Sequence, residues 1–337
     1  FSLSTWFLSS LTATSLSFSV LKKSINDART IKESTLNSYL TSIRKLHNAI
    51  FDTETFKNID FLMDFDKIVG AISALSFNSQ RSYTNAVIVA LTSVSDKKHE
   101  NALQKYRDFY EKLNSEYRDI IEKNEKSETE EKNWVELKEL KKVMNGYKRE
   151  LNERDIFKKD KDTITKKSFD LLQRWVVANL YLHDSNPPVR LNYGDLGIVS
   201  EKFYNNLDNG YKETNNFLVI KSRNVKYFSF GDFKTKSSMG LSIIPVGKIL
   251  NSVLNIWLKF NVNDYLLVDS RGGVMNSNQL SKYIARVFEP TGKKITINIL
   301  RHIYISTKFP VADTKFKKEI AKKMMHSGAT QDEYAKS

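Results

Sequence analysis

The residues best suited to chemistry lie near the carboxyl end of the chain. His326 and Tyr334 are close together in the sequence, and both follow an Arg301-His302 pair set in an otherwise apolar stretch. A tyrosine hydroxyl has a free pKa of about 10, so it becomes a nucleophile only where cations and a base assist it. This arrangement suggests a tyrosine nucleophile beside a cluster that binds phosphate.

Two further cations complete the candidate site. Arg190 follows two prolines, and Lys234 opens a Lys-Thr-Lys-Ser-Ser turn at the end of a predicted strand. Each residue has an ordinary alternative: a surface ion pair for Arg190, one of many hairpin lysines for Lys234, and a helix cap or core histidine for His326. Arg301 is harder to explain in this way, because an arginine on an apolar helix requires an anionic partner. The residues therefore indicate a site only as a set.

In their order along the chain, these segments resemble the tyrosine recombinase (phage integrase) family. The matching segments are Pro-Val-Arg190-Leu-Asn-Tyr, Asp-Phe-Lys234-Thr, Ile-Leu-Arg301-His302-Ile-Tyr and Met-His326-Ser-Gly-Ala-Thr-Gln-Asp-Glu-Tyr334. They look most similar to the integrase-like proteins of large DNA viruses and protist mobile elements. The N-terminal segment Ser34-Thr35-Leu36-Asn37-Ser38-Tyr39-Leu40 looks like part of the family's core-binding domain, so the resemblance covers nearly the whole chain.

The resemblance implies a role for each of the main site residues. Tyr334 would attack the phosphodiester, Arg190 and Arg301 would clamp the scissile phosphate, and His326 would assist. Bidentate arginines suit this task because phosphoryl transfer concentrates negative charge on the non-bridging oxygens. Since these cations would take the place of a metal and a 3′-phosphotyrosine would conserve the bond energy, we expect no metal, no ATP and no other cofactor.

The same resemblance assigns the general acid. Lys234 would protonate the leaving 5′ oxygen of the sugar, and Lys236 is the alternative for this role. A lysine beside a cationic cluster has a lowered pKa, which brings its proton within reach of the reaction at neutral pH.

Three positions differ from the family's usual pattern. The histidine that often precedes the second arginine by three residues is Asn298 here, which can donate a hydrogen bond to phosphate but carries no titrating proton. The acidic residue expected after the first arginine is Tyr193, so Asp195 is the nearest carboxylate able to orient Arg190. The final histidine-to-tyrosine spacing is one residue shorter than the common one. The supporting residues are expected to be Asn298, His302, Asp195 and Lys236.

Composition favours a nucleic-acid partner. The 337-residue chain has a formal net charge of +14 and a pI near 9.5, which favours a polyanion, and no basic amphipathic helix ends in a hydrophobic membrane anchor. The absence of cysteine excludes disulfides, zinc ribbons and thiol catalysis. Composition therefore favours a nucleic acid over a membrane. Together with the resemblance, it leads us to expect double-stranded DNA as the partner, no membrane association, and an intracellular location in a nucleus or viral replication compartment.

The periodicity predicts a mainly α protein with a small antiparallel β-sheet, in two domains. A helical DNA-binding domain (1–124), a charged linker without apolar residues (125–133) and a mixed α+β catalytic domain (134–337) are expected. The clearest helices are predicted at 30–51, 79–95, 168–182, 247–260, 276–288, 296–308 and 315–325. Strands are predicted at 216–221, 226–233 and 241–246. The polar face of the helix at 30–51 carries Lys32, Arg44, Lys45 and His47, and the first three of these, with Arg81, are the candidate DNA contacts.

These expectations combine into a site-specific recombinase that cleaves and rejoins DNA through a 3′-phosphotyrosine, with four protomers assembled on two DNA sites. The alternatives are a type IB topoisomerase, a telomere resolvase, and a DNA-binding protein of the same fold whose catalysis has decayed.

Overall fold

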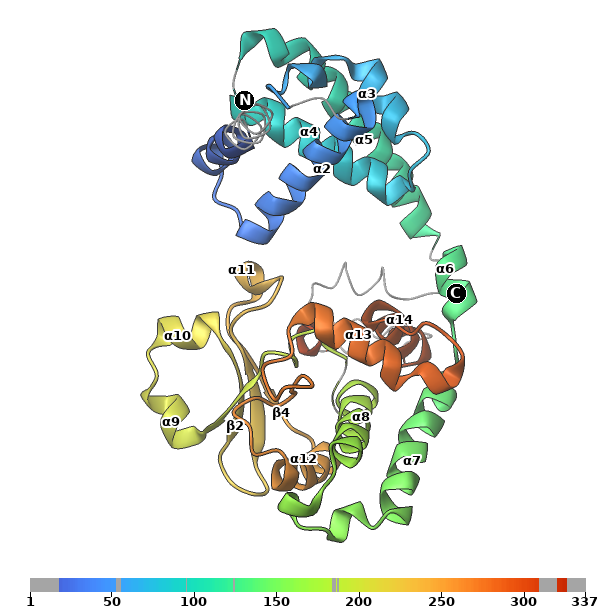
Figure 1. Ribbon diagram of the computed structural model, residues 1–337, viewed down its shortest axis with the longest axis vertical. Helices are drawn as coiled ribbons and strands as arrows, with labels where there is room; N and C mark the ends of the chain where they lie inside the picture. Colours follow the sequence, from blue (N-terminus) through green and yellow to red (C-terminus); the bar gives the residue numbers. More distant parts are fainter. Residues whose placement is uncertain are drawn as a thin grey trace, which may run out of the picture. The chain divides into compact units, whose positions relative to one another are not determined.

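The computed structural model describes residues 18–52, 56–94, 96–123, 125–183, 186, 188–308 and 320–325. The chain divides into two compact units, Phe1–Lys123 and Asn124–Ser337. The described residues are mainly helical, with a four-stranded sheet in the second unit (Figure 1). In the described part of the chain, no helix is both long enough and apolar enough to cross a membrane.

The first unit is a bundle of amphipathic helices around one apolar core. Its main helices are α2 (Glu33–Phe51), α3 (Phe65–Ile72), α4 (Phe77–Val94) and α5 (Glu100–Glu122), with short 3-10 turns at Asp60–Met63 and Lys97–His99. Helix α4 packs against both α2 and α5. The helical segment 18–28 adds Phe18, Leu21 and Ile25 to the same core.

One residue predicted for the basic face of α2 lies in this core instead. His47 is only 6% exposed, and its ring contacts the rings of Phe51, Phe56 and Phe61. The reason is helical geometry: His47 follows the buried Ile43 by one turn and therefore continues the apolar stripe. The other three predicted basic residues are exposed: Arg44 and Lys45 on α2, and Lys32 just before its first residue.

The segment 125–133, predicted as a linker, contains helix α6 (Glu128–Asn133). Ser127 and Glu130 form a capping box that begins this helix. Two hydrogen bonds join the end of this helix to residues 293–294, elsewhere in the second unit. Lys293 Nζ donates to the Lys132 carbonyl (2.8 Å), and Lys294 N donates to Asn133 Oδ1 (2.9 Å). Caps and polar bonds of this kind explain how a segment without apolar residues becomes ordered.

The second unit is organised around one buried helix. Helix α8 (Lys166–Leu182) begins after the cap Thr165 and is in contact with α7 (Leu137–Glu153), α12 (Lys248–Phe260) and α13 (Ser277–Val287). Helix α14 (Ile297–Lys308) contacts α7. Of the predicted helix at 315–325, the structure describes only 320–325, and residues 320–323 are helical.

The sheet has the order β1-β2-β3-β4, and it is mixed rather than antiparallel. The predicted strands correspond to β2 (Asn216–Ile220), β3 (Lys226–Phe230) and β4 (Ser242–Pro245), which pair antiparallel. The strand β1 (Gly197–Ser200) was not predicted, and it pairs parallel with β2. No hairpin turn signals β1 in the sequence, because a parallel pair needs a crossover. This crossover holds α9 (Glu201–Asn206) and α10 (Asn209–Thr214).

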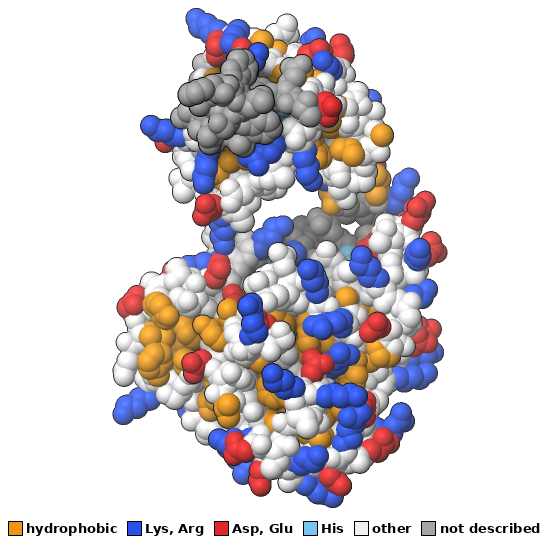
Figure 2. Space-filling model, in the orientation of Figure 1, with side chains coloured by type: hydrophobic (Ala, Val, Ile, Leu, Met, Phe, Trp, Pro, Cys, Tyr) orange, Lys and Arg blue, Asp and Glu red, His pale blue; other side chains and the backbone are white. Residues whose placement is uncertain are grey.

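The two faces of the sheet pack against different partners. Leu218, Phe228 and Phe230 join the main core with the helices, whereas Phe217 and Val219 pack with Tyr204 of α9. Figure 1 shows α9 and α10 on one side of the sheet and α8 and α12 on the other. Figure 2 shows hydrophobic side chains gathered over α9 and α10. This alternation follows from the two-residue period of a strand and holds the ends of β2 and β3 rigidly.

Candidate active site

Arg301 is the buried centre of the candidate site. It lies on α14 and is 0% exposed, between apolar neighbours. Its Nη1 donates to the carbonyl oxygen of Pro188 at 2.8 Å and faces the carbonyl oxygen of Met324 at 3.4 Å. A guanidinium keeps its charge even when buried, so these oriented carbonyl dipoles help to hold a positive charge inside the fold.

Arg190 lies on the segment that Arg301 holds. Its own carbonyl accepts a hydrogen bond from the Tyr181 hydroxyl at 3.0 Å. Burial raises the pKa of Tyr181, and the nearby charge of Arg301 opposes that shift, so Tyr181 lies close to both arginine segments. The Arg190 Nε is buried without a hydrogen-bond partner among the described residues. A buried unpaired guanidinium N–H is unfavourable unless an acceptor binds there, which makes it a natural contact for an anion.

Lys234 follows β3 in a loop whose start is fixed to the Arg190 segment. The amide oxygen of Asn216 accepts from the backbone N–H groups of Gly231 (3.0 Å) and Asp232 (3.1 Å). Its amide nitrogen donates to Asp195 Oδ1 and to the Asp232 carbonyl, both at 3.0 Å. Asn216 is 3% exposed, and its place in the sequence did not mark it as part of the site, because both of its bonded neighbours are distant in the chain.

Gly231 explains why the chain can pass so closely at this point. A Cβ at this position would lie 2.0 Å from the Lys212 carbonyl oxygen and 2.6 Å from the Asn215 carbonyl oxygen. Only glycine leaves room for that backbone contact, so the path from β3 to Lys234 depends on it.

Asp195, expected to orient Arg190, has a different partner. Among the described residues it forms no ion pair with Arg190, and its Oδ1 accepts from Asn216. Although part of the side chain is exposed, desolvation of the carboxyl raises the pKa of Asp195, and the bond from Asn216 opposes that shift. Tyr193 is a core residue, 1% exposed and packed edge-on against Tyr181 and Phe228, and burial raises its pKa.

The two candidate lysines differ in their contacts. Lys234 is exposed and forms no ion pair within the described part of the chain. Lys236 begins the short helix α11 (Lys236–Met239), and its Nζ lies 3.3 Å from Glu213 Oε2. An ammonium already paired with a carboxylate is less available to a leaving oxygen, so the geometry favours Lys234.

Met324 and Met325, which precede His326, contact both the helix of Arg301 and the loop of Lys234. The Met324 carbonyl faces Arg301, and the Met325 carbonyl accepts a 2.6 Å hydrogen bond from Thr235 Oγ1, next to Lys234. His326 and Tyr334 themselves lie outside the described residues. The structure thus brings together the segments that carry Arg190, Lys234 and Arg301 with the residues immediately before His326.

The other supporting residues lie on α14. Asn298 is exposed, one turn before Arg301. His302 Nε2 lies 3.1 Å from Glu130 Oε1 of α6, so its contact is with the helix at the start of the second unit. Within the described residues, no group of three or more His, Asp and Glu side chains is placed to hold a metal ion.

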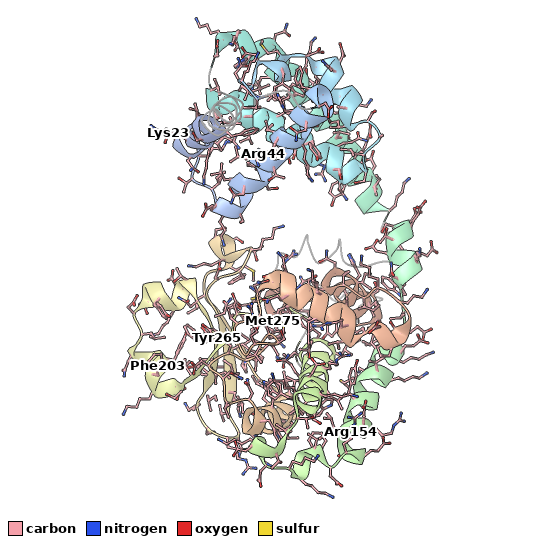
Figure 3. All side chains as sticks on the ribbon, in the orientation of Figure 1. Lys23, Arg44, Arg154, Phe203, Tyr265 and Met275 are labelled. Atoms are coloured by element: carbon pink, nitrogen blue, oxygen red, sulfur yellow. The ribbon has the colours of Figure 1, made fainter. Side chains whose placement is uncertain are left out.

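The candidate DNA contacts of the first unit fall into two classes. Lys32, Arg44 and Lys45 are exposed on α2, and Figure 3 labels Arg44 there. Arg81 instead donates from Nε and Nη2 to Asn114 Oδ1 at 3.0 and 2.8 Å, and lies 3.7 Å from the ring centroid of Tyr117. Its guanidinium joins α4 to α5, which marks it as a packing residue.

Comparison with known proteins gives a limited result. No protein-family model and no curated protein matches the sequence. Among solved structures, a chain described as the crystal structure of XerA recombinase is similar over 94% of this chain and 92% of that chain, with 13% sequence identity and a TM-score of 0.38. At this identity and TM-score the similarity is coarse, and it carries no argument about the reaction or the residues that perform it.

Proposed function

We propose that this protein is a site-specific DNA recombinase that cleaves and rejoins strands through a tyrosine bound covalently to the 3′ phosphate. The proposal rests on one observation: hydrogen bonds join four segments that are distant in the sequence. Arg301 donates to the segment of Arg190 and faces the carbonyl of Met324. Thr235 donates to the carbonyl of Met325. Asn216 joins the start of the Lys234 loop to Asp195. Cationic side chains from all four segments would then surround one phosphate.

The proposed reaction is a transesterification in which side chains of the protein supply both the nucleophile and the proton donor. The phenolic hydroxyl of Tyr334 loses its proton to a neighbouring base or to water, and its oxygen forms a bond to phosphorus while the bond from phosphorus to the 5′ oxygen breaks. Arg190 and Arg301 hold the non-bridging oxygens, and the fixed guanidinium geometry favours the more negative transition state. His326 assists at the phosphate, and Lys234 gives a proton to the departing 5′ oxygen. Attack by a second 5′ hydroxyl reverses these steps and joins new strands.

The substrate in this proposal is duplex DNA. The net charge of +14 and the exposed cations of α2 supply phosphate contacts, whose contribution to affinity falls steeply with salt. Strand exchange between two sites requires four active subunits, so the working assembly is a tetramer on paired sites. Such a reaction belongs in a nucleus or a viral replication compartment, as part of a mobile or viral element.

A second candidate has specific support. Tyr193 occupies a core position where a carboxylate was expected, and Asp195 bonds Asn216. These features suit a DNA-binding protein that keeps the fold without the reaction. A type IB topoisomerase would share the covalent chemistry but would relax a supercoiled plasmid at low protein concentration without paired sites.

Covalent capture distinguishes a strand-cleaving enzyme from the non-catalytic alternative, and the relaxation assay separates the topoisomerase. The full chain is incubated with a library of randomised duplexes containing nicks, then denatured, and DNA that remains attached is sequenced. Mass spectrometry of the attached peptide identifies the modified residue. The proposal predicts a phosphotyrosine at Tyr334 and none with Tyr334→Phe, which should retain DNA binding. Binding without any adduct in the wild-type protein would support the non-catalytic alternative.

A further inference from the structure

The hydroxyl of Thr235 makes a contact that the proposed reaction does not yet use. Thr235 Oγ1 donates to the Met325 carbonyl oxygen at 2.6 Å, across 90 positions of sequence. The same hydroxyl lies 3.7 Å from Met239 Sδ. A hydroxyl has one proton to donate, and the short bond to the carbonyl takes it, because thioether sulfur is a weak acceptor.

Both ends of this bond are held in place. The Thr235 carbonyl accepts from Met239 N at 3.2 Å and from Ser238 Oγ at 2.9 Å, which ties Thr235 to α11. Met325 is 2% exposed and has a φ of 56°, in the left-handed region that residues other than glycine rarely adopt. Its amide N donates to the Lys322 carbonyl. The backbone conformation of Met325, the last described residue before His326, is therefore tightly constrained.

Lys234 lies between two anchored neighbours. On one side Phe233 is 5% exposed in the main core, and on the other side Thr235 is bonded to Met325. Lys234 itself is exposed. Loss of the Thr235 hydroxyl bond would leave the C-terminal side of Lys234 held only through α11 and would free the Met325 carbonyl.

We infer that Thr235 is a positioning residue, which fixes Lys234 against the segment that carries His326 so that the proton donor meets the leaving oxygen. The inference rests on the proposed function and adds a residue to it. Thr235 touches neither phosphate nor sugar, and it acts through Lys234. A displacement of about 1 Å in a catalytic group costs up to about 100-fold in rate, so a single hydrogen bond at this place is enough to control the protonation step.

The test compares two leaving groups. A duplex carrying the sequence recovered by covalent capture is made with an ordinary phosphodiester at the cleaved junction and, separately, with sulfur in place of the bridging 5′ oxygen. A thiol has a pKa of about 8.5, so the sulfur departs as a thiolate and needs no proton from Lys234. Single-turnover cleavage is measured for the wild type, Thr235→Val, Thr235→Ser and Ser237→Ala. Ser237→Ala is the matched control, because it removes an exposed hydroxyl of the same loop.

The inference predicts a specific pattern. Thr235→Val, which keeps the shape of the side chain and loses the donor, should cleave the ordinary duplex about 10- to 100-fold more slowly and cleave the sulfur duplex at nearly the wild-type rate. Thr235→Ser and Ser237→Ala should match the wild type on both. Unchanged cleavage by Thr235→Val, or equal slowing on both duplexes, overturns the inference.

Two controls keep the result interpretable. Thermal unfolding of Thr235→Val shows whether the variant is folded, and Thr235→Ala replaces it if Thr235→Val is not. If the wild-type protein forms no adduct with either duplex, the proposed function itself is contradicted. If the wild type cleaves and Thr235→Val cleaves equally well, only the inference about Thr235 is contradicted.

Discussion

Arg301 on α14 donates a 2.8 Å hydrogen bond to the carbonyl oxygen of Pro188, 113 positions earlier in the chain. The bond holds the segment of Arg190 against the helix of Arg301, so the two guanidinium groups proposed to bind one phosphate are positioned by a direct contact. Arg301 thus has a structural role as well as a proposed catalytic one.

This dual role predicts the effect of Arg301→Lys. A lysine keeps the charge but has no planar fork, so it cannot hold a backbone carbonyl and a phosphate oxygen together. We expect adduct formation to fall by about 100- to 1000-fold and the free energy of unfolding to fall by about 1 to 3 kcal/mol. Rates on a nicked duplex and urea denaturation measure the two effects. Arg271→Lys is the matched control, since the Arg271 side chain is 87% exposed, and it should change neither.

The two lysines near the end of β3 give the second prediction. Lys234→Ala should slow cleavage by about 100-fold or more, because general acid catalysis contributes that much. Lys236→Ala should change the rate by less than about threefold, since the Lys236 ammonium is paired with Glu213 and Lys234 remains as the proton donor. Single-turnover cleavage by each variant decides the assignment. The reverse result would give the general acid role to Lys236.

The elements with strong periodicity were predictable from the sequence. Helices α2, α4, α8 and α12 lie close to their predicted ranges, because their apolar residues repeat at helical spacing over several turns. Strands β2 and β3 are mostly apolar runs, and β2, β3 and β4 follow one another through turns. The short helices α9 and α10 have too few residues to carry a pattern, and β1 has no hairpin turn to signal its pairing, because it pairs parallel with β2 across these helices.

The candidate site was predictable only in its charged residues. Arg301 is recognisable as an arginine in an apolar helix. Asn216 and Thr235 are not, because their importance comes from hydrogen bonds to segments far away in the sequence, and a polar residue in a loop or strand gives no hint of its partner. Asp195 and Arg81 show a different limit of sequence analysis. Both were chosen as candidates for their charge, but the spacing of residues in the sequence does not reveal their hydrogen-bond partners.

The first unit provides a third prediction, which separates DNA contacts from packing contacts. Arg44→Ala with Lys45→Ala removes two exposed charges from α2, so DNA affinity should fall and the slope of log affinity against log salt should decrease by about 2. Arg81→Ala should leave that slope unchanged and lower the free energy of unfolding by about 1 kcal/mol, through loss of the bonds to Asn114 and the stacking on Tyr117. Salt titrations of binding and denaturation curves test the pair. If Arg81→Ala lowered the slope of log affinity against log salt, Arg81 would be a DNA contact after all.

Lys226 gives a prediction about pH. Its Nζ donates to the carbonyl of Arg223 and to the side-chain oxygens of Asn251 and Asn255, at 2.8, 2.7 and 2.6 Å, and it is 3% exposed. Burial lowers the pKa of Lys226 below its usual value of 10.5. Between the lowered pKa and 10.5, the unfolded chain therefore binds more protons than the folded chain, and the contribution of Lys226 to the free energy of unfolding rises with pH.

Lys226→Met isolates this contribution from the other groups that titrate in the same range. The variant removes the ammonium donor from the side-chain oxygens of Asn251 and Asn255, while the Arg223 carbonyl keeps its hydrogen bond from the Asn251 amide. The variant should therefore be less stable than the wild type by about 1 to 3 kcal/mol near neutral pH. Because the variant has no proton to lose, the difference between wild type and variant should widen as the pH is raised towards 10.5. Urea denaturation of both proteins at neutral and alkaline pH measures it. A difference that stays constant or narrows would show that the Lys226 ammonium is not disfavoured by burial, and that the three oxygens fully compensate its loss of water.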